Sequence, residues 1–241
     1  VAPETGKVER LNPLPFKDQH QFYNDAFNDN FDSKILAPDW VFRRVPQPNT
    51  YSLNAKKGYL RLYLKPETFE PRKRYSAMGI TQKESEFEWE AKMIFNPKKN
   101  LEEAGISVYQ KDINFVNLTV QKIGKEHFVK VTVKEKNNQV TAMTDSAKIP
   151  NTEVKAFKSK ALPSYAGEIL LKIASKNGKY LYFFSTDGGA SYEKLAETPD
   201  NIVLGMMYTG ANVGIYATSN GQKTTGYADF DWVSYKGFVK Q

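Results

Sequence analysis

Strict alternation of apolar and polar side chains recurs along this chain and constrains its fold more than any other feature. In "GYLRLYLK", Leu60, Leu62 and Leu64 share one face, and in "EFEWEAKMIF" a second apolar row runs from Phe87 to Phe95. Successive side chains of a strand point to opposite faces, so this period of two predicts half-buried β-strands. About a dozen such segments without intervening helical patterns predict antiparallel sheets packed face to face.

Turn residues separate these strands. "KNGK", around Asn177 and Gly178, predicts a tight hairpin because Asn-Gly accepts a positive φ, and "STDGGASY" predicts a second turn with Tyr192 packed beneath it. Short helical turns fit only at 96–105 and 198–205, and 146–167 lacks a clean period, which predicts an irregular surface excursion. The strand count exceeds an immunoglobulin-like domain and predicts an all-β, two-sheet antiparallel jelly-roll sandwich.

The 241 residues predict one such domain over 27–241, preceded by an extended lead-in at 1–26. The chain has no cysteine, which excludes disulfides, thiolate metal sites and cysteine nucleophiles. No apolar run reaches the roughly 20 residues of a membrane span. The net charge is +7, but charges of both signs alternate, so the basic cluster at 70–76 is expected to be a solvated loop and no nucleic acid partner is expected.

A row of carboxylates accompanies the apolar row that begins at Phe87. Glu84, Glu86, Glu88 and Glu90 alternate along one face, about 6.5–7 Å apart. One interpretation is an outer, solvent-facing register with no catalytic residue. The other is a jelly-roll glycosidase that uses Glu86, Glu88 and Glu90, because glycoside hydrolysis needs two carboxyl groups roughly 5–9.5 Å apart.

Acidic residues also lie near both ends of the domain. Asp29 and Asp32 come early, and Asp229 and Asp231 come late. If the terminal strands lie side by side, these oxygens converge and suit one structural calcium ion, the only cofactor that the sequence suggests. The other interpretation is an edge strand with a polar register, in which Phe230 and Trp232 pack in the core.

An ordered set of motifs carries a family resemblance. The chain closes on "YTGANVGIYATSNGQKTTGYADFDWVSY", and earlier segments in matching order are "NDNFDSKILAPDWVFRRVPQPNTYSL", "GYLRLYL", "FNPKKNLEEAGISVYQ" and "YFFSTDGGASYEKL". Over about 27–235 this set resembles the C-terminal sandwich module of family 43 glycoside hydrolases, the β-xylosidase and arabinofuranosidase group.

The resemblance implies a concanavalin A-like sandwich whose partner, a preceding five-bladed propeller, holds the hydrolytic carboxylates. It implies a chain that packs on that propeller or binds xylan- or arabinan-type polysaccharide. Tyr208, with Met207 beside it, matches the family's projecting Phe, Gln82 remains from an Arg-Arg-Gln stretch, and Asn212 lies in the Gly-Ala-x-Val-Gly run. A secreted, periplasmic or cell-envelope location is expected, although no signal peptide is visible. A free-standing carbohydrate-binding protein is the alternative.

Overall fold

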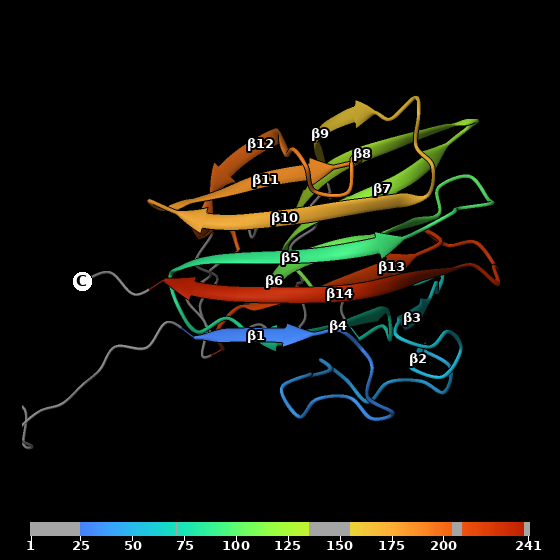
Figure 1. The fold of residues 1–241 in the computed structure, drawn as a ribbon, viewed down its shortest axis with the longest axis horizontal. Coiled ribbons are helices and arrows are strands. Elements are labelled where there is room, and N and C mark those ends of the chain that lie inside the picture. The colour runs from blue at the N-terminus through green and yellow to red at the C-terminus, as the bar shows by residue number, and fades with distance from the viewer. Residues whose placement is uncertain (1–24, 71, 135–154, 204–208, 239–241) are drawn as a thin grey trace, which may run out of the picture.

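Two antiparallel sheets pack face to face in the computed structural model, which describes residues 25–70, 72–134, 155–203 and 209–238 (Figure 1). The larger sheet has eight strands in the order β12-β11-β10-β5-β14-β3-β2, with β1 paired to β14. Its strands are β1 (Ala26–Asp29), β2 (Tyr51–Ser52), β3 (Leu60–Tyr63), β5 (Glu86–Ile94), β10 (Glu168–Lys176), β11 (Lys179–Ser185), β12 (Glu193–Pro199) and β14 (Tyr227–Phe238).

The smaller sheet has six strands in the order β4-β13-β6-β7-β8-β9. They are β4 (Ser76–Thr81), β6 (Glu103–Lys111), β7 (Asn114–Ile123), β8 (Glu126–Lys134), β9 (Lys155–Ala161) and β13 (Asn212–Thr218). All the pairings between these named strands are antiparallel. The predicted all-β, two-sheet antiparallel sandwich is confirmed.

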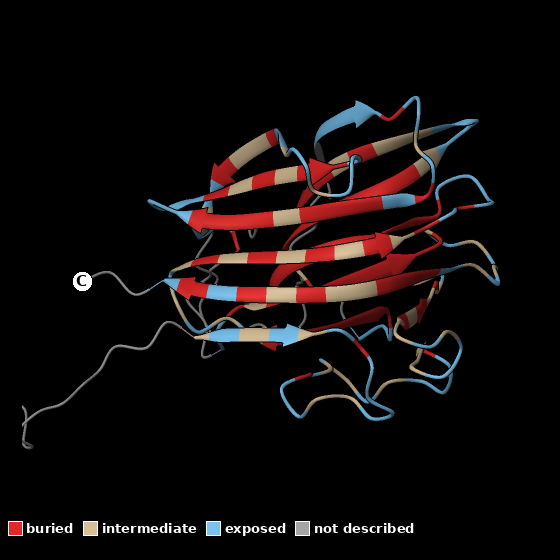
Figure 2. Cartoon of the chain, viewed as in Figure 1, coloured by how far each residue is buried: buried red, intermediate tan, exposed pale blue. Residues whose placement is uncertain are grey.

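The alternation in the sequence becomes the core between the sheets. On β5, Phe87, Trp89, Ala91 and Met93 are fully buried, and the residues between them remain partly exposed, as the banding of β5 in Figure 2 shows. The Trp89 indole N–H donates to the carbonyl of Gly214 on the opposite sheet, at 3.0 Å. A buried tryptophan needs such an acceptor, so this contact links the two sheets as well as filling the core.

A second, smaller cluster covers the outside of the six-stranded sheet. The Phe69 ring stacks on Tyr216 with centroids 4.7 Å apart and an interplanar angle of 11°. Tyr75, Tyr109 and Phe115 surround Phe69 at 4.6–5.3 Å. The connection from β3 to β4 therefore lies against the sheet rather than projecting into solvent.

The structure confirms some local predictions and corrects others. The Asn177–Gly178 hairpin joins β10 to β11, with φ of 51° and 73°, and a short 3₁₀ turn, η1 (Asp200–Ile202), lies within 198–205. The turn expected at 96–105 is not helical, because the Glu102 carboxylate accepts the amides of residues 98 and 99 instead. The irregular excursion expected at 146–167 is wrong in part, since β9 pairs there with β8.

The limits of the domain can be followed only within the described residues. The lead-in predicted at 1–26 lies outside them except for Asp25 and Ala26, and Ala26 already pairs with Lys236 as the first residue of β1. Within the described ranges, helices with the length and apolar character needed to cross a membrane are absent.

Candidate functional site

One end of the sandwich, which we call the proximal end, brings together two of the predicted binding residues. There β1 begins and β14 ends, at the left of Figure 1, and Ala26 pairs with Lys236. On the other sheet β4 ends and β13 begins, with Thr81 paired to Asn212. Residues far apart in sequence therefore meet at one end, because in an antiparallel pair one strand begins beside the end of its partner.

Gln82 and Asn212 lie side by side at the proximal end. The Gln82 amide N–H donates to the carbonyl of Ala211 at 3.0 Å, and its side-chain Nε2 donates to the carbonyl of Glu84 at 2.9 Å. Its Oε1 is buried and has no hydrogen-bond partner among the described residues. A buried carbonyl oxygen without a hydrogen bond costs about 1–3 kcal/mol, a cost that a donor outside the described residues would remove. Tyr208 and Met207, predicted beside them, lie outside the described residues.

A cavity of about 160 Å³ opens at the same end. Phe27 and Tyr235 supply aromatic surface, and Thr81 and Lys83 flank Gln82 in the sequence. Lys83 forms an ion pair with Asp25 at 3.2 Å. The proximal end is thus a concave surface with aromatic, hydroxyl and charged groups, the mixture that ligand and partner sites use.

Glu84 does not belong to the carboxylate row, because β5 begins at Glu86. The Tyr235 hydroxyl donates to Glu84 Oε2 at 2.6 Å, and the Asp25 amide donates to Oε1 at 3.3 Å. Burial and this hydrogen bond raise the pKa of Tyr235 to about 12. Glu84 therefore connects the start of β1 to the end of β14.

The remaining members of the row face outward from the eight-stranded sheet. Glu86 accepts the amide N–H of Asn177 at 3.1 Å. Glu90 accepts the hydroxyl of Tyr192, and Lys172 is its cross-strand partner on β10. Burial raises the pKa of Glu90, with a further contribution from Glu88, while Lys172 opposes the shift. The row occupies the outer register of the first interpretation.

Tyr192 reaches Glu90 because the predicted turn folds as expected. The Asp187 carboxylate accepts the Ser185 hydroxyl at 2.6 Å and the Ser191 amide at 3.1 Å. These hydrogen bonds hold the pKa of Asp187 well below its usual range. The turn then places the Tyr192 ring 4.0 Å from the Lys172 ammonium, on the outer face of the sheet.

The early acids of the expected calcium site take other partners. Asp29 accepts the Phe31 amide at 2.9 Å and the Trp40 indole N–H at 2.8 Å. Asp32 accepts the side-chain amide of Asn30 at 2.7 Å, on the surface. Asp29 thus orients the Trp40 ring, which packs edge-on against Trp89 with centroids 6.4 Å apart.

The late acids are paired with cations. Asp229 receives two hydrogen bonds from Arg61, at 2.8 and 3.0 Å, and Asp231 lies 3.1 Å from the Lys92 ammonium. A bulge between Phe230 and Trp232 shifts the register, so Phe230 is buried as expected but Trp232 is only half-buried. Although β1 and β14 do pair, the described residues contain no group of three or more acids or histidines placed to hold a metal ion. The predicted calcium ion therefore has no set of ligands among the described residues.

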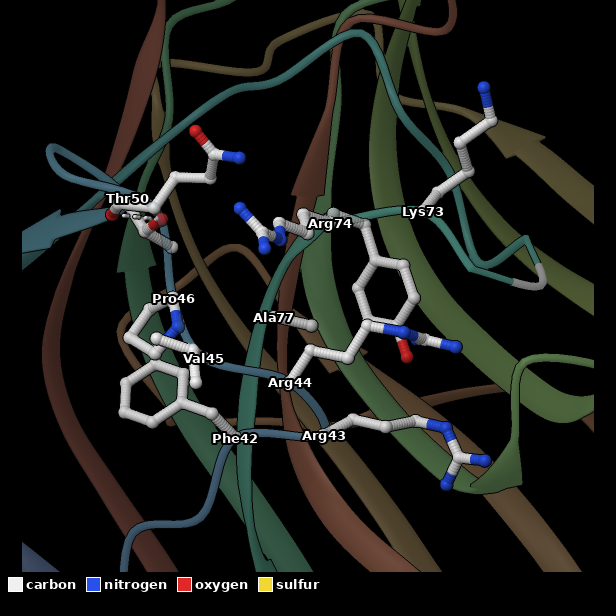
Figure 3. A pocket seen from close by; sticks show the side chains of 11 residues that line it. Phe42, Arg43, Arg44, Val45, Pro46, Thr50, Lys73, Arg74 and Ala77 are labelled. Atoms are coloured by element: carbon white, nitrogen blue, oxygen red, sulfur yellow. Dashed lines mark hydrogen bonds between the residues drawn. The ribbon is translucent and has the colours of Figure 1, made fainter.

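Lys73 and Arg74 of the basic cluster line a narrow pocket beside β4, together with Arg43 and Arg44 (Figure 3). Arg43 and Arg44 both bind the buried carboxylate of Asp112, at 2.8 and 2.7 Å, and the Tyr75 hydroxyl donates to it at 2.6 Å. Burial alone would raise the pKa of Asp112, but these hydrogen bonds and positive charges hold it below its usual value. In Figure 3 Lys73 points away from the other labelled basic side chains, and it is exposed.

The opposite, distal end carries site residues that the sequence pattern does not single out. Tyr227 opens β14 with 42% of its surface exposed, and the Arg61 guanidinium lies over its ring at 3.6 Å. Alternation supplies the only signal in the sequence: Ala228 faces the core, so Tyr227 faces outward.

The order of the strands and the packing of the two sheets define a concanavalin A-like β-sandwich. The family model described as "Beta xylosidase C-terminal Concanavalin A-like domain" matches residues 28–236, and the chain belongs to this family. The motif resemblance to family 43 glycoside hydrolases is confirmed.

Relatives of the whole chain are longer proteins. The chain is 31% identical over 239 residues to the non-reducing end alpha-L-arabinofuranosidase BoGH43B of Bacteroides ovatus, spanning 97% of this chain and 42% of that protein. It is 26% identical to a xylosidase/arabinosidase of Butyrivibrio fibrisolvens, spanning 84% of this chain and 36% of that one. A solved structure titled Bacteroides ovatus Xyloglucan PUL GH43B superposes with a TM-score of 0.77 at 27% identity, spanning 93% of this chain and 42% of the other.

Proposed function

We propose that this chain is the accessory, non-catalytic sandwich of a xylan- or arabinan-degrading glycoside hydrolase. It packs through its proximal end against a catalytic propeller domain and helps to shape the substrate pocket. The observation that carries this proposal is the concave surface at the proximal end, where Phe27, Lys83 and Tyr235 line a cavity close to the predicted residues Gln82 and Asn212. The curated relatives support it as well, because the chain spans only 42% and 36% of their lengths.

The hydrogen bonds of Glu84, and of Glu86 in the carboxylate row, support a non-catalytic role. Glu84 is held by Tyr235 and by the backbone of Asp25, and Glu86 accepts the Asn177 amide. A pair of hydrolytic carboxyl groups must instead flank a bound sugar, one of them free to donate a proton. In this proposal the module works where polysaccharides occur, as part of a secreted, periplasmic or cell-envelope enzyme.

One observation favours the jelly-roll glycosidase as a second candidate. Glu90 is half-buried with a raised pKa, beside Tyr192, and a general acid needs such a shift to stay protonated near neutral pH. Glu88 lies two residues away on the same face and would be the second carboxyl group. Hydrolysis of nitrophenyl glycosides by this chain alone separates the two candidates.

We expect this chain alone to release no nitrophenol from nitrophenyl xyloside or arabinoside, and the product of the complete reading frame to release it. In that product, Asn212→Arg should lower kcat/KM because a long cation at the proximal end prevents close packing of the two domains. Steady-state kinetics with both substrates measure the effect, which should be at least about tenfold.

The matched control is Asn54→Arg, the same substitution in the exposed connection between β2 and β3. It should leave kcat/KM unchanged. Turnover by this chain alone that disappears in Glu88→Gln and Glu90→Gln would establish the glycosidase instead. A reading frame without a further domain would favour the free-standing carbohydrate-binding protein.

A further inference from the structure

The distal end of the sandwich carries a pocket. A catalytic domain packed against the proximal end would leave this pocket free. It has a volume of about 170 Å³ and lies between residues 94–102 and 224–229. In Figure 1 this is where β5 ends and β14 begins, at the right, across the molecule from the start of β1. We propose that this pocket binds a sugar ring that carries a carboxylate, a uronic acid unit of a glycan. The inference rests on the proposed function only in taking a glycan as the ligand.

The walls of the pocket are held together by hydrogen bonds between its two loops. The Lys99 ammonium donates to the carbonyl of Lys223 at 2.6 Å, and the Thr224 hydroxyl donates to Glu102. Behind them, Asn220 Nδ2 donates to the carbonyl of Leu101 at 2.8 Å. Because the loops are already joined, binding does not have to order them, and preformed pockets of this kind lose less entropy on binding.

Tyr227 provides the surface on which a sugar ring can stack. Arg61 lies over the ring at 3.6 Å, and Tyr63 packs edge-on with centroids 6.5 Å apart. Arg61 is itself fixed by its two hydrogen bonds to Asp229. The ring is thus immobilised while 42% of the residue remains accessible, and an immobilised, exposed aromatic ring suits the C–H face of a pyranose.

The charges around the pocket select the kind of sugar. Lys98 and Lys99 line it together with Asp229 and Glu102. The charge of Asp229 is compensated by its ion pairs with Arg61 and Lys56, which lie outside the lining. Glu102 is 1% exposed and accepts backbone amides. Among the described residues the Lys98 ammonium has no ion pair or hydrogen bond, which leaves it available for a charge-assisted hydrogen bond to a ligand carboxylate.

The test is calorimetric titration of the full chain with two xylo-oligosaccharides of equal length, one with a glucuronic acid branch and one without. We expect the branched sugar to bind at least about tenfold more tightly, with an affinity that falls as salt is added. Lys98→Gln should remove this preference, and Tyr227→Ala should weaken the binding of both sugars. Equal affinities for the two sugars, or no binding of either, would overturn the proposal.

Phe238→Ala is the matched control, because Phe238 is also 42% exposed but lies at the end of β14, at the proximal end. It should leave the affinity unchanged, and Tyr227→Phe should retain binding. Thermal unfolding verifies that each variant is folded. Affinities that neither Tyr227→Ala nor Lys98→Gln changes would also overturn the proposal. The titrations measure binding without turnover, whereas the proposed function is tested by hydrolysis of nitrophenyl glycosides, so this proposal and the proposed function can fail separately.

Discussion

At the scale of single residues, polar side chains on the outer face have defined partners that a period of two does not reveal. The alternation places Glu84 and Glu90 in one row, yet Glu84 binds Tyr235 at the edge of the sheet and Glu90 binds Tyr192 on its face. The difference arises because β5 begins only at Glu86. The outward register of Glu88 and Glu90 was predictable from sequence, whereas their partners come from distant segments and were not.

The raised pKa of Glu90 makes a prediction about pH. A carboxyl group whose folded-state pKa is raised contributes most to stability below its unfolded value, about 4.3, and this contribution is lost as the pH rises through the folded value. Glu90→Gln is neutral at every pH, so its free energy of unfolding relative to the wild type should increase from about pH 4 to pH 7. Urea unfolding of the wild type and the variant at both pH values measures this. The same relative stability at both pH values would contradict the prediction.

At the scale of elements, the central strands of the smaller sheet leave no room for side chains at their glycines. A methyl group on Gly105 of β6 would lie 2.2 Å from the carbonyl oxygen of Leu118 and 2.7 Å from Cα of Thr119 on β7. Real Cβ atoms do not approach backbone so closely, so the two strands would have to separate. The close approach of β6 and β7 therefore depends on glycine at this position.

We expect Gly105→Ala to lower the free energy of unfolding by about 1–3 kcal/mol or more, as overpacking of a core does. Gly210→Ala is the control, because nothing among the described residues lies within 4 Å of the place that its methyl group would occupy. That variant should stay within about 0.5 kcal/mol of the wild type. Chemical denaturation measures both, and an unchanged stability of Gly105→Ala would show that the strands adjust at no cost.

Elements were predictable from sequence where both strands of a pair keep register, and not where a bulge interrupts it. The alternation of β5 predicted each buried residue from Phe87 to Phe95. At β9 the pairing with β8 shifts register between Val131 and Thr132. The lysines of β9 also interrupt the apolar alternation by which a strand is predicted. The bulge beside Trp232 likewise turned a predicted core residue outward.

At the scale of the whole molecule, the sandwich separates two kinds of surface. The proximal end has Gln82, Asn212 and a cavity, and the distal end has a pocket lined by Tyr227, Lys98 and Lys99. A linear family motif suggested the first. The second depends on loops at 96–102 and 219–226 that approach each other only in the folded chain, which is why the sequence did not indicate it.

Pairing of β1 with β14 places the first and last strands that the structure describes side by side in one sheet. Because the two ends of the domain lie close together, we expect the fold to tolerate new chain ends at an exposed turn. A circular permutant that joins Gln241 to Val1 and opens the chain between Gly124 and Lys125, in the exposed β7–β8 turn, should keep the same sheets. Far-ultraviolet circular dichroism and a single cooperative melting transition would verify this. A permutant without that transition would show that the fold requires the native order of the strands along the chain, and not only their pairing in the sheets.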